Sequence, residues 1–334
     1  MKKGLICSAL GLLAILVFVF ASCTVDPSPD GGNGDDGHDD YVYLGEDYSF
    51  NKPNSAYSDP EYAEGTVFEY ETYNSTVHWV ENKGDHIFTL TALPKDAEEG
   101  DKFPVLILLH GFNSRYTEYD LYIPYFIESG FACVMFDFRG GAQSGGKSDG
   151  DIFNMTLDTE ISDVKAITAF VERQSFADTD NMILVGHSQG GLIASLAAAS
   201  DELVDKFNGM LLIAPGFSIV TDNGGPYFDG TKKIPSSCTM LYVQMSGDYI
   251  RSLVAHKDLY TEIAAFKRPV KILLGTMDGL FTEEDMQDAI EAYGDMVTYE
   301  RVEGGIHDFS AEILETAYPE QIEPFLLSLI ATDS

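Results

Sequence analysis

One serine stands between two glycines, at residues 186–190, which read Gly-His-Ser-Gln-Gly. The short apolar run 182–185 comes directly before this segment, and the run 191–199 of small and apolar residues follows it. The first run is typical of a buried strand and the second of a helix, so Ser188 lies at a sharp turn between them. Such a turn needs glycine where a side chain would clash, and it exposes the serine hydroxyl. We therefore interpret Ser188 as a nucleophile rather than a bystander in a glycine-rich turn.

A serine hydroxyl becomes a strong nucleophile when a histidine, itself oriented by a carboxylate, takes its proton. Only two of the seven histidines, His256 and His307, follow Ser188 in the chain. His307 follows the last predicted strand, in a loop at the carboxyl end of the sheet, where the sites of open α/β folds lie. His256 belongs to a helical pattern and is explained as a surface or core histidine. We predict that His307 is the base.

The carboxylate that orients the base is expected to be Asp278. This residue lies just beyond a predicted buried strand, at the same sheet edge as His307. Asp285 follows on a helical pattern, and the helix dipole explains an acidic residue in the first turn. Glu303 is close to His307 in the sequence and stays an alternative.

A tetrahedral oxyanion needs two backbone N–H donors. We expect one from Gln189, directly after the nucleophile, and one from Phe112, in the loop after the first parallel strand. That loop reads His-Gly-Phe-Asn at 110–113, and we interpret His110 as a structural residue that ties it. Next along the chain, Asp137 and Arg139 are expected to form an ion pair that braces the following loop.

The elements that must position these groups are visible in the apolar pattern. Residues 66–73 and 86–93 alternate in Thr-, Val- and Tyr-rich runs, which predict antiparallel strands. After residue 104, continuous apolar runs alternate with helical patterns, as in a parallel sheet with helices on its faces. These runs are 105–109, 132–136, 182–185, 210–214, 270–274 and 297–302. The expected fold class is α/β, with a mostly parallel central sheet flanked by helices.

Residues 215–268 break this rhythm. The segment is too long for a simple crossover and is rich in glycine, proline and aromatic residues. It follows the sixth predicted strand, and we predict that it forms a cap. Asp158 or Thr159 is expected to cap the start of the helix before the nucleophile strand.

The first 22 residues are typical of an export signal. Lys2 and Lys3 form a basic start, an apolar run of 16 residues spans 5–20, and two small residues precede Cys23. This run is shorter than the roughly 20 residues that a membrane-spanning helix needs. Residues 20–23, Phe-Ala-Ser-Cys, resemble a bacterial lipobox, which implies that Cys23 carries a lipid and becomes the first mature residue. A plain secretory cleavage nearby is the alternative.

Residues 23–40 are predicted to form an acidic tether, ahead of a single domain at 41–334. From residue 24 to 40 the chain has six Asp, four Gly and no Lys or Arg, a composition that cannot form a core. The tether resembles the surface-export signals of lipoproteins in the Bacteroidota, and a spacer without an address is the alternative. We therefore expect an exported bacterial lipoprotein of the outer membrane or cell surface, on the periplasmic or the external face.

The charge of the chain excludes one class of partner. The formal net charge is −34, and removal of 1–22 takes away two lysines and no acidic residue, which gives −36. Nucleic acid is therefore not expected as a partner, whereas a membrane is expected through the lipid anchor.

Cysteine usage predicts neither a disulfide framework nor a metal site. Of the four cysteines, Cys7 leaves with the signal and Cys23 is the lipidation site. Cys133 lies in an apolar run, which favours a buried thiol over a bridge to Cys238. No Cys/His spacing suits a metal, and we predict no cofactor.

Residues from about 103 to 309 resemble the α/β-hydrolase superfamily and, within it, the cinnamoyl and feruloyl esterase branch. This resemblance implies a triad of Ser188, Asp278 and His307, with Phe112 and Gln189 as oxyanion donors. It also implies that the cap holds a phenolic acyl group, with Tyr260 as an aromatic contact. The segments that carry it are Leu-Leu-His110-Gly-Phe112, Phe136-Asp-Phe-Arg-Gly140, Gly186-His-Ser-Gln-Gly-Gly191, Ala214-Pro215, Leu274-Gly-Thr-Met-Asp278 and Glu303-Gly-Gly-Ile-His307.

The leading functional hypothesis is carboxylic-ester hydrolysis through an acyl-enzyme, on an aromatic or other acyl ester of plant polysaccharide. A serine aminopeptidase or acylaminoacyl peptidase is a second hypothesis, which needs a cap carboxylate to bind a free amine. A non-catalytic glycan-binding lipoprotein on a hydrolase fold is a third. The candidate amine-binding residues are Asp222, Asp229, Asp248 and Asp258.

Overall fold

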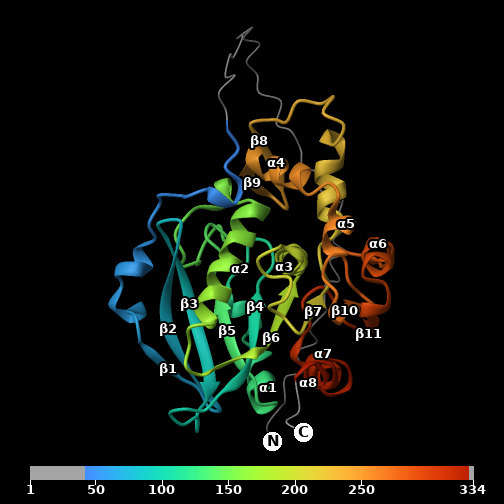
Figure 1. Ribbon diagram of the computed structural model, residues 1–334. Coiled ribbons are helices and arrows are strands. Elements are labelled where there is room, and N and C mark those ends of the chain that lie inside the picture. The colour runs from blue at the N-terminus through green and yellow to red at the C-terminus, as the bar shows by residue number, and fades with distance from the viewer. Residues whose placement is uncertain (1–41, 331–334) are drawn as a thin grey trace, which may run out of the picture.

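The computed structural model describes residues 42–330, which fold around one nine-stranded sheet in the order β1-β2-β3-β5-β4-β6-β7-β10-β11 (Figure 1). Six of these strands, from β5 to β11 in that order, pair in parallel. The strands are β1 (Val67–Glu69), β2 (Tyr73–Asn82), β3 (Asp85–Pro94), β4 (Phe103–Leu109), β5 (Ala132–Phe136), β6 (Ala177–His187), β7 (Gly209–Ile213), β10 (Val270–Gly275) and β11 (Val297–Val302). The predicted mostly parallel α/β sheet is confirmed.

The antiparallel part of the sheet has three strands where the sequence predicted two. Residues 66–73 were expected to form one strand, but β1 ends at Glu69 and the chain turns back into β2. A three-residue strand followed by a turn has the same Thr- and Tyr-rich composition as one longer strand, so composition could not separate them. The cap segment therefore follows the seventh strand of the chain, not the sixth.

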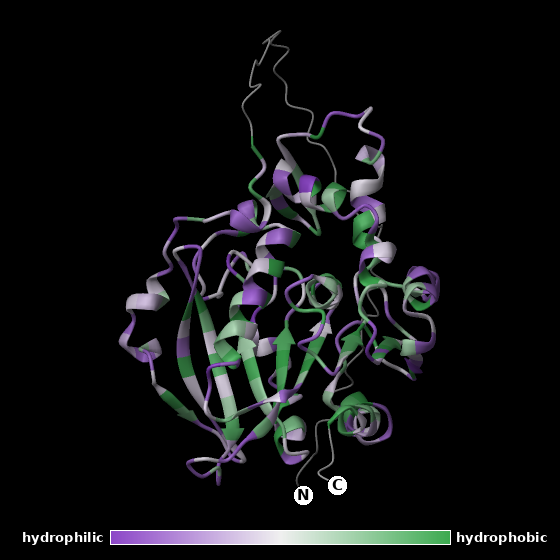
Figure 2. Ribbon diagram, viewed as in Figure 1, coloured by the Kyte–Doolittle hydropathy of each residue, from purple (hydrophilic) through white to green (hydrophobic). Residues whose placement is uncertain are grey.

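Helices cover both faces of the sheet, which is why its central strands are apolar without interruption (Figure 2). In β4, Val105, Ile107 and Leu109 join the core on one face, whereas Leu106 and Leu108 join the core on the other. The first core includes α2 and α3, and the second includes α1, α7 and α8. The helices are α1 (Ile123–Glu128), α2 (Leu157–Val171), α3 (Gln189–Ala199), α4 (Gly247–Ala255), α5 (Leu259–Ile263), α6 (Glu283–Tyr293), α7 (Ala311–Ala317) and α8 (Glu323–Leu329).

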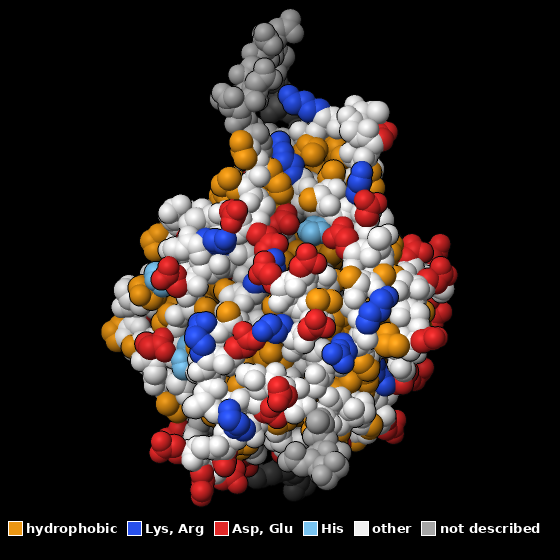
Figure 3. Space-filling model, viewed as in Figure 1, with side chains coloured by type: hydrophobic (Ala, Val, Ile, Leu, Met, Phe, Trp, Pro, Cys, Tyr) orange, Lys and Arg blue, Asp and Glu red, His pale blue; other side chains and the backbone are white. Residues whose placement is uncertain are grey.

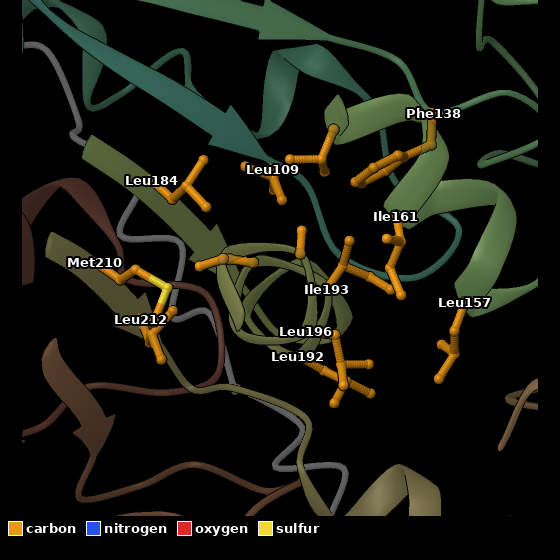
Figure 4. Close-up of a cluster of buried hydrophobic side chains, with 14 of the residues drawn as sticks. Leu109, Phe138, Leu157, Ile161, Leu184, Leu192, Ile193, Leu196, Met210 and Leu212 are labelled. Atoms are coloured by element: carbon orange, nitrogen blue, oxygen red, sulfur yellow. The ribbon is translucent and has the colours of Figure 1, made fainter. Parts of the chain in front are cut away.

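Helix α3 lies at the centre of the first core (Figure 4). Its leucines and isoleucine, Leu192, Ile193 and Leu196, pack among side chains from β4, β6, β7 and α2. Every residue of α3 except the last is buried. A helix fixed on all sides gives the turn that precedes it a rigid support.

Helix α2 begins at Leu157, and its N-cap is Thr156 rather than Asp158 or Thr159 as predicted. Thr156 is the N-cap: its hydroxyl accepts a hydrogen bond from Thr159 N (3.1 Å), and Thr159 Oγ1 accepts one from Thr156 N (3.0 Å). This reciprocal pair satisfies two N–H groups at the helix start, so it sets the boundary. Asp158 bonds instead to Tyr43 and His256.

The segment between β7 and β10 lies beyond the carboxyl ends of the parallel strands (Figure 1). It contains a two-stranded hairpin, β8 (Ser237–Met240) and β9 (Val243–Ser246), together with α4, α5 and a π-helical turn at Val220–Gly224. Tyr249, Ile250 and Leu253 of α4 are fully buried and belong to the first core. The segment is thus packed onto the sheet's helical layer.

Arg139 does not pair with Asp137, so that prediction was wrong. Its guanidinium Nε donates to Asp163 Oδ1 (2.5 Å) and its Nη1 donates to Asp85 Oδ2 (3.0 Å). Asp137 accepts instead from two backbone amides, at Tyr116 and Lys147. Strand β5 ends at Phe136, so the alternation that would place residues 137 and 139 on one face stops before them.

Cys133 is a buried free thiol within β5, as predicted, and forms no bridge to Cys238. Burial raises the pKa of the Cys133 thiol and keeps it protonated.

The predicted signal peptide, the tether and the lipidation site Cys23 lie outside the described residues. Within 42–330, no helix is both long enough and apolar enough to cross a membrane. On the face seen in Figure 3, acidic side chains are spread widely with basic ones between them, in keeping with the net charge of −34.

Candidate active site

Ser188 has a backbone conformation that few residues other than glycine adopt, with φ 52° and ψ −124°. It lies between β6 and α3, and hydrogen bonds to both sides hold it there. Its N–H donates to Ile213 O (3.0 Å), and its carbonyl accepts from Gly191 N (3.0 Å) and Gly216 N (2.9 Å). Strain of this kind persists where the surroundings determine the backbone, as they do here.

The two flanking glycines allow this turn to pack closely. A Cβ on Gly186 would lie 2.5 Å from Gly190 O, and a Cβ on Gly190 would lie 2.2 Å from Leu109 O. Both contacts are with backbone oxygens, which cannot swing away as a side chain can. These two contacts explain why the turn requires glycine at both positions, as the sequence predicts.

His307 and Asp278 come together across the loops that follow β11 and β10. His307 Nδ1 lies 2.9 Å from Asp278 Oδ2, while Asp278 Oδ1 accepts from Leu280 N (2.7 Å) and Phe281 N (3.0 Å). The Asp278 side chain is only 1% exposed. Burial alone would raise the pKa of Asp278, but the hydrogen bond and charge of His307 and the two amides outweigh it, so this pKa is lowered. An ionised Asp278 keeps the proton on Nδ1 and leaves Nε2 as the basic atom of His307.

The alternative residues have other partners. His256 lies between Asp158 (3.1 Å) and Glu262 (2.7 Å), where it joins the end of α4 to α2 and α5. Asp285 caps α6 by accepting from Thr282 N. Glu303 is exposed.

The predicted oxyanion loop passes directly beside Ser188. A Cβ on Gly111 would lie 3.1 Å from Ser188 Cβ, which places the loop of Phe112 against the nucleophile turn. His110 Nδ1 donates to Gly111 O (2.8 Å), and its Nε2 accepts from Phe138 N (3.1 Å). These bonds tie the loop, which is the structural part expected of His110. Gln189 begins α3, so its N–H is one of the free donors at the helix N-terminus.

The side chain of Gln189 has two hydrogen-bond partners that no local pattern of residues indicates. Its Nε2 donates to Glu160 Oε2 (2.8 Å), and its Oε1 accepts from the hydroxyl of Tyr249 (2.8 Å). All three side chains are buried. Tyr249 belongs to the cap and its ring lies 6.4 Å from that of Phe112, so the cap is linked to both predicted oxyanion donors.

Tyr260 lies half-buried on α5. Burial, followed by the charges of Asp288, Asp285 and Asp222, raises the pKa of Tyr260 to about 12. Its contact with a substrate stays a prediction.

His187 and Glu118 also border the site, and the sequence analysis assigned neither of them. His187 was visible as the residue before the nucleophile, but Glu118 lies 69 positions away and belongs to no motif. Among residues 42–330, no group of three or more His, Cys, Asp or Glu side chains is placed to hold a metal ion.

One sequence family matches the part of the chain that contains the turn at Ser188. The family described as "Serine aminopeptidase, S33" matches residues 100–247, somewhat less than half of the chain. A protein of Escherichia coli described as an uncharacterized 31.7 kDa protein in the traX-finO intergenic region is 33% identical over 132 residues. That match covers 39% of this chain and 45% of the relative, so the chain spans about half the length of that relative.

Solved structures match over far more of the chain. Est1E from Butyrivibrio proteoclasticus, solved with ferulic acid bound, aligns with a TM-score of 0.64 and 22% identity over 76% of this chain and 100% of its own. Acetyl xylan esterase 1 from Thermoanaerobacterium sp. JW/SL YS485 aligns with a TM-score of 0.57 and 17% identity, over 86% and 98%. A monoacylglycerol lipase of Paleococcus ferrophilus aligns with a TM-score of 0.54 and 19% identity, over 73% and 99%. With its sheet order and strained serine turn, the chain therefore has the α/β-hydrolase fold, which it shares with an esterase and a lipase.

Proposed function

We propose that the protein is a serine carboxylic-ester hydrolase that works through an acyl-enzyme intermediate. The observation that carries this proposal is the His307–Asp278 hydrogen bond in loops beside a strained serine. The backbone carbonyl of His307 lies 3.0 Å from Nε2 of His187, the residue before Ser188, so the base and the nucleophile come from adjoining segments.

In this mechanism Ser188 Oγ attacks the ester carbonyl carbon while His307 Nε2 takes the hydroxyl proton. The negative charge that develops on the carbonyl oxygen is stabilised by N–H groups of Phe112 and Gln189. His307 then gives the proton to the leaving alcohol as the ester C–O bond breaks. Water then attacks the acyl carbon while His307 takes its proton. As the second tetrahedral intermediate collapses, the bond to Ser188 Oγ breaks, His307 returns the proton to Oγ and the acid leaves.

The test of this mechanism is replacement of the nucleophile. Ser188→Ala is expected to lower turnover of an aryl ester by at least roughly 10³-fold, because only binding and the oxyanion donors remain. A fluorophosphonate probe should label the wild type and not this variant. The matched control is Ser200→Ala, which removes a hydroxyl just after α3 and is expected to keep activity and labelling. Undiminished turnover by Ser188→Ala would reject the assignment.

We propose further that the acyl group is aromatic and is esterified to plant polysaccharide. The support is the aromatic pair of Phe112 and Tyr249 beside the oxyanion loop, together with the ferulic acid and acetyl xylan chemistry of two structural relatives. A panel of feruloyl, acetyl and long-chain esters compares these acyl groups directly. A preference for long-chain esters would reject this choice of substrate and leave ester hydrolysis standing.

A serine aminopeptidase is the second candidate, favoured by the family that matches residues 100–247. Of the four candidate carboxylates, Asp229 is tied to Thr231 and Asp248 to Arg251. Burial and then the charge of Asp285 raise the pKa of Asp222, against a hydrogen bond from Ser218, and a cationic amine would relieve this repulsion. Faster turnover of aminoacyl anilides than of matched aryl esters would select this function.

Absence of both activities and of fluorophosphonate labelling would select the third hypothesis, a non-catalytic glycan-binding protein.

We propose that the protein is exported and is anchored as a lipoprotein, through Cys23, at the outer membrane or cell surface. The basic start, the apolar run and the small residues before Cys23 support it. Cells fed a fatty acid with a clickable tag should label the wild type and not a Cys23→Ala variant. Equal labelling of both would contradict lipidation at this residue.

A further inference from the structure

Glu118 and His187 lie outside the proposed triad, yet together they touch three segments of the site. His187 ends β6, directly before the nucleophile. Glu118 lies in a 3₁₀ helix, Tyr116–Tyr119, that follows the oxyanion loop. The side chain of His187 is 8% exposed and that of Glu118 is 15% exposed, so the pair is nearly buried.

The contacts of this pair reach both neighbouring loops. His187 Nδ1 lies 2.9 Å from Glu118 Oε1, and His187 Nε2 lies 3.0 Å from the backbone oxygen of His307. Gly111 N, in the oxyanion loop, donates to Glu118 Oε1 (3.1 Å) and Oε2 (3.2 Å). The nucleophile turn, the oxyanion loop and the loop of the base are therefore joined through the side chains of Glu118 and His187. We call this pair the clamp.

The chemistry of these contacts fixes the protonation state of His187. A carboxylate and a backbone carbonyl only accept hydrogen bonds, so each ring nitrogen needs its own hydrogen to make both bonds. A neutral imidazole carries one hydrogen and can keep only one of them. The pair is thus complete when His187 is the imidazolium.

The electrostatics of the surroundings favour this charged form. Burial alone would lower the pKa of His187, but the charge and hydrogen bond of Glu118, then Asp308 and the carbonyl of His307, raise it to about 9. Burial alone would raise the pKa of Glu118. The charge and hydrogen bond of His187, followed by the charge of His110, lower this pKa instead.

Two titratable side chains of the loop after β11 also face His187. The ring of His307 lies 4.7 Å from the ring of His187, between centroids. Asp308, in the loop after β11, lies 3.6 Å from Nε2 and is 77% exposed. The pair lines a cavity of about 210 Å³, through which solvent protons can reach it. The other side chains that line the cavity are Tyr119, Leu121, Tyr122, Asp308 and Phe309.

We propose that Glu118 and protonated His187 are positioning residues, which hold the oxyanion loop and the loop of His307 in register with Ser188 and set the alkaline limit of activity. The proposal rests on the proposed hydrolase function. When His187 loses a proton, the charge of Glu118 retains the hydrogen on Nδ1, so the bond to His307 O is lost. The backbone of the base then loses its link to the nucleophile turn.

The wild type is expected to lose kcat/KM for an aryl ester with an apparent pKa near 9, because the clamp opens as His187 deprotonates. Glu118→Gln removes the main charge that raises this pKa, so the alkaline limb should move to lower pH. His187→Gln carries an N–H donor that does not titrate, so the limb should disappear. At pH 7 both variants should lose up to about 10²-fold in kcat with little change in KM, as for a displaced base.

The matched control is His256→Gln. His256 also lies between two carboxylates, Asp158 and Glu262, and the hydrogen bonds and charges of these partners overcome burial to raise its pKa to about 9. It contacts none of the three loops, so the alkaline limb should stay where it is. Thermal unfolding between pH 7 and 10 checks that the wild type is still folded where its activity falls.

Three outcomes decide between the ideas. A wild type with no alkaline limb, or with a limb that neither Glu118→Gln nor His187→Gln moves, overturns the clamp and leaves the hydrolase function intact. A wild type that neither hydrolyses esters nor reacts with a fluorophosphonate rejects the proposed function and the clamp together. Because the wild-type profile alone can overturn the clamp, the test stands even if a variant fails to fold.

Discussion

Glu160→Gln is expected to stabilise the protein by an amount that grows with pH. The Glu160 side chain is buried in α2, and its Oε2 accepts a hydrogen bond from Gln189 Nε2 (2.8 Å). Burial, and to a lesser degree the charge of Asp163, raises the pKa of Glu160 well above its ordinary value of 4.5, while Gln189 opposes this shift. The buried guanidinium of Arg139 bonds to Asp163 and Asp85 rather than to Glu160. Burial therefore favours the neutral carboxylic acid form of Glu160 in the folded protein.

The magnitude follows from proton linkage. Below pH 4.5, Glu160 is protonated in both the folded and the unfolded chain, so its titration changes nothing. Above that pH only the unfolded chain releases the proton, and the free energy of unfolding falls by about 1.4 kcal/mol per pH unit until the folded pKa is reached. Glutamine does not titrate and can still accept from Gln189. The stability of the variant minus that of the wild type should therefore rise between pH 5 and 7, by at most about 2.6 kcal/mol.

Urea unfolding at pH 5, 6 and 7 measures this difference, with the fluorescence of Trp79, the only tryptophan, as the probe. The matched control is Glu81→Gln, the same chemical change at an exposed position of β2. A difference for Glu160→Gln that stays constant over this range would show that the buried carboxyl ionises in the folded state and would refute the reasoning. An equal rise in the control would assign the effect to net charge instead.

Three further replacements test the site and its support. Asp278→Asn should reduce kcat by about 10⁴-fold with little effect on folding, because His307 would lose the carboxylate that fixes its tautomer; steady-state kinetics and thermal unfolding check this. Gly190→Ala forces a Cβ to 2.2 Å from a backbone oxygen and should cost at least about 1–3 kcal/mol in denaturant unfolding, whereas Gly225→Ala meets nothing within 4 Å and should be tolerated. Arg139→Met should cost about 3–5 kcal/mol by the same assay, because it leaves two buried carboxylates without their cation. Lys52→Met breaks a surface pair with 61% exposure at the lysine and should cost less than about 1 kcal/mol.

The features that could be predicted from the sequence are those that depend on neighbouring residues. The parallel strands are short apolar runs because helices cover both faces, and that pattern is local. The turn at Ser188 is also local, since its glycines answer clashes within the same few residues and with the adjacent β4. The prediction of a triad of Ser188, Asp278 and His307 likewise rests on the position of each residue relative to a strand end.

Pairings between distant segments could not be predicted in this way. Arg139 was paired with Asp137, its near neighbour, but its partners Asp85 and Asp163 are 54 and 24 positions away. Tyr249 and Gln189 are likewise 60 positions apart, in the cap and the nucleophile turn. Neither separation along the chain corresponds to a helical or strand repeat, so only the fold reveals these contacts.

The two residues that flank Ser188 show how differently one buried carboxyl group can behave from another. His187 faces Glu118 and can carry a charge, so that carboxyl is ionised and the pair shares two opposite charges. Gln189 faces Glu160 and is a neutral amide that brings no opposite charge, so burial raises the pKa of that carboxyl. Glu118→Gln should therefore destabilise the folded protein at neutral pH, because it leaves a buried imidazolium without its partner, while Glu160→Gln stabilises it. One chemical change on either side of the nucleophile thus has opposite effects, and the residue next to Ser188 decides the sign.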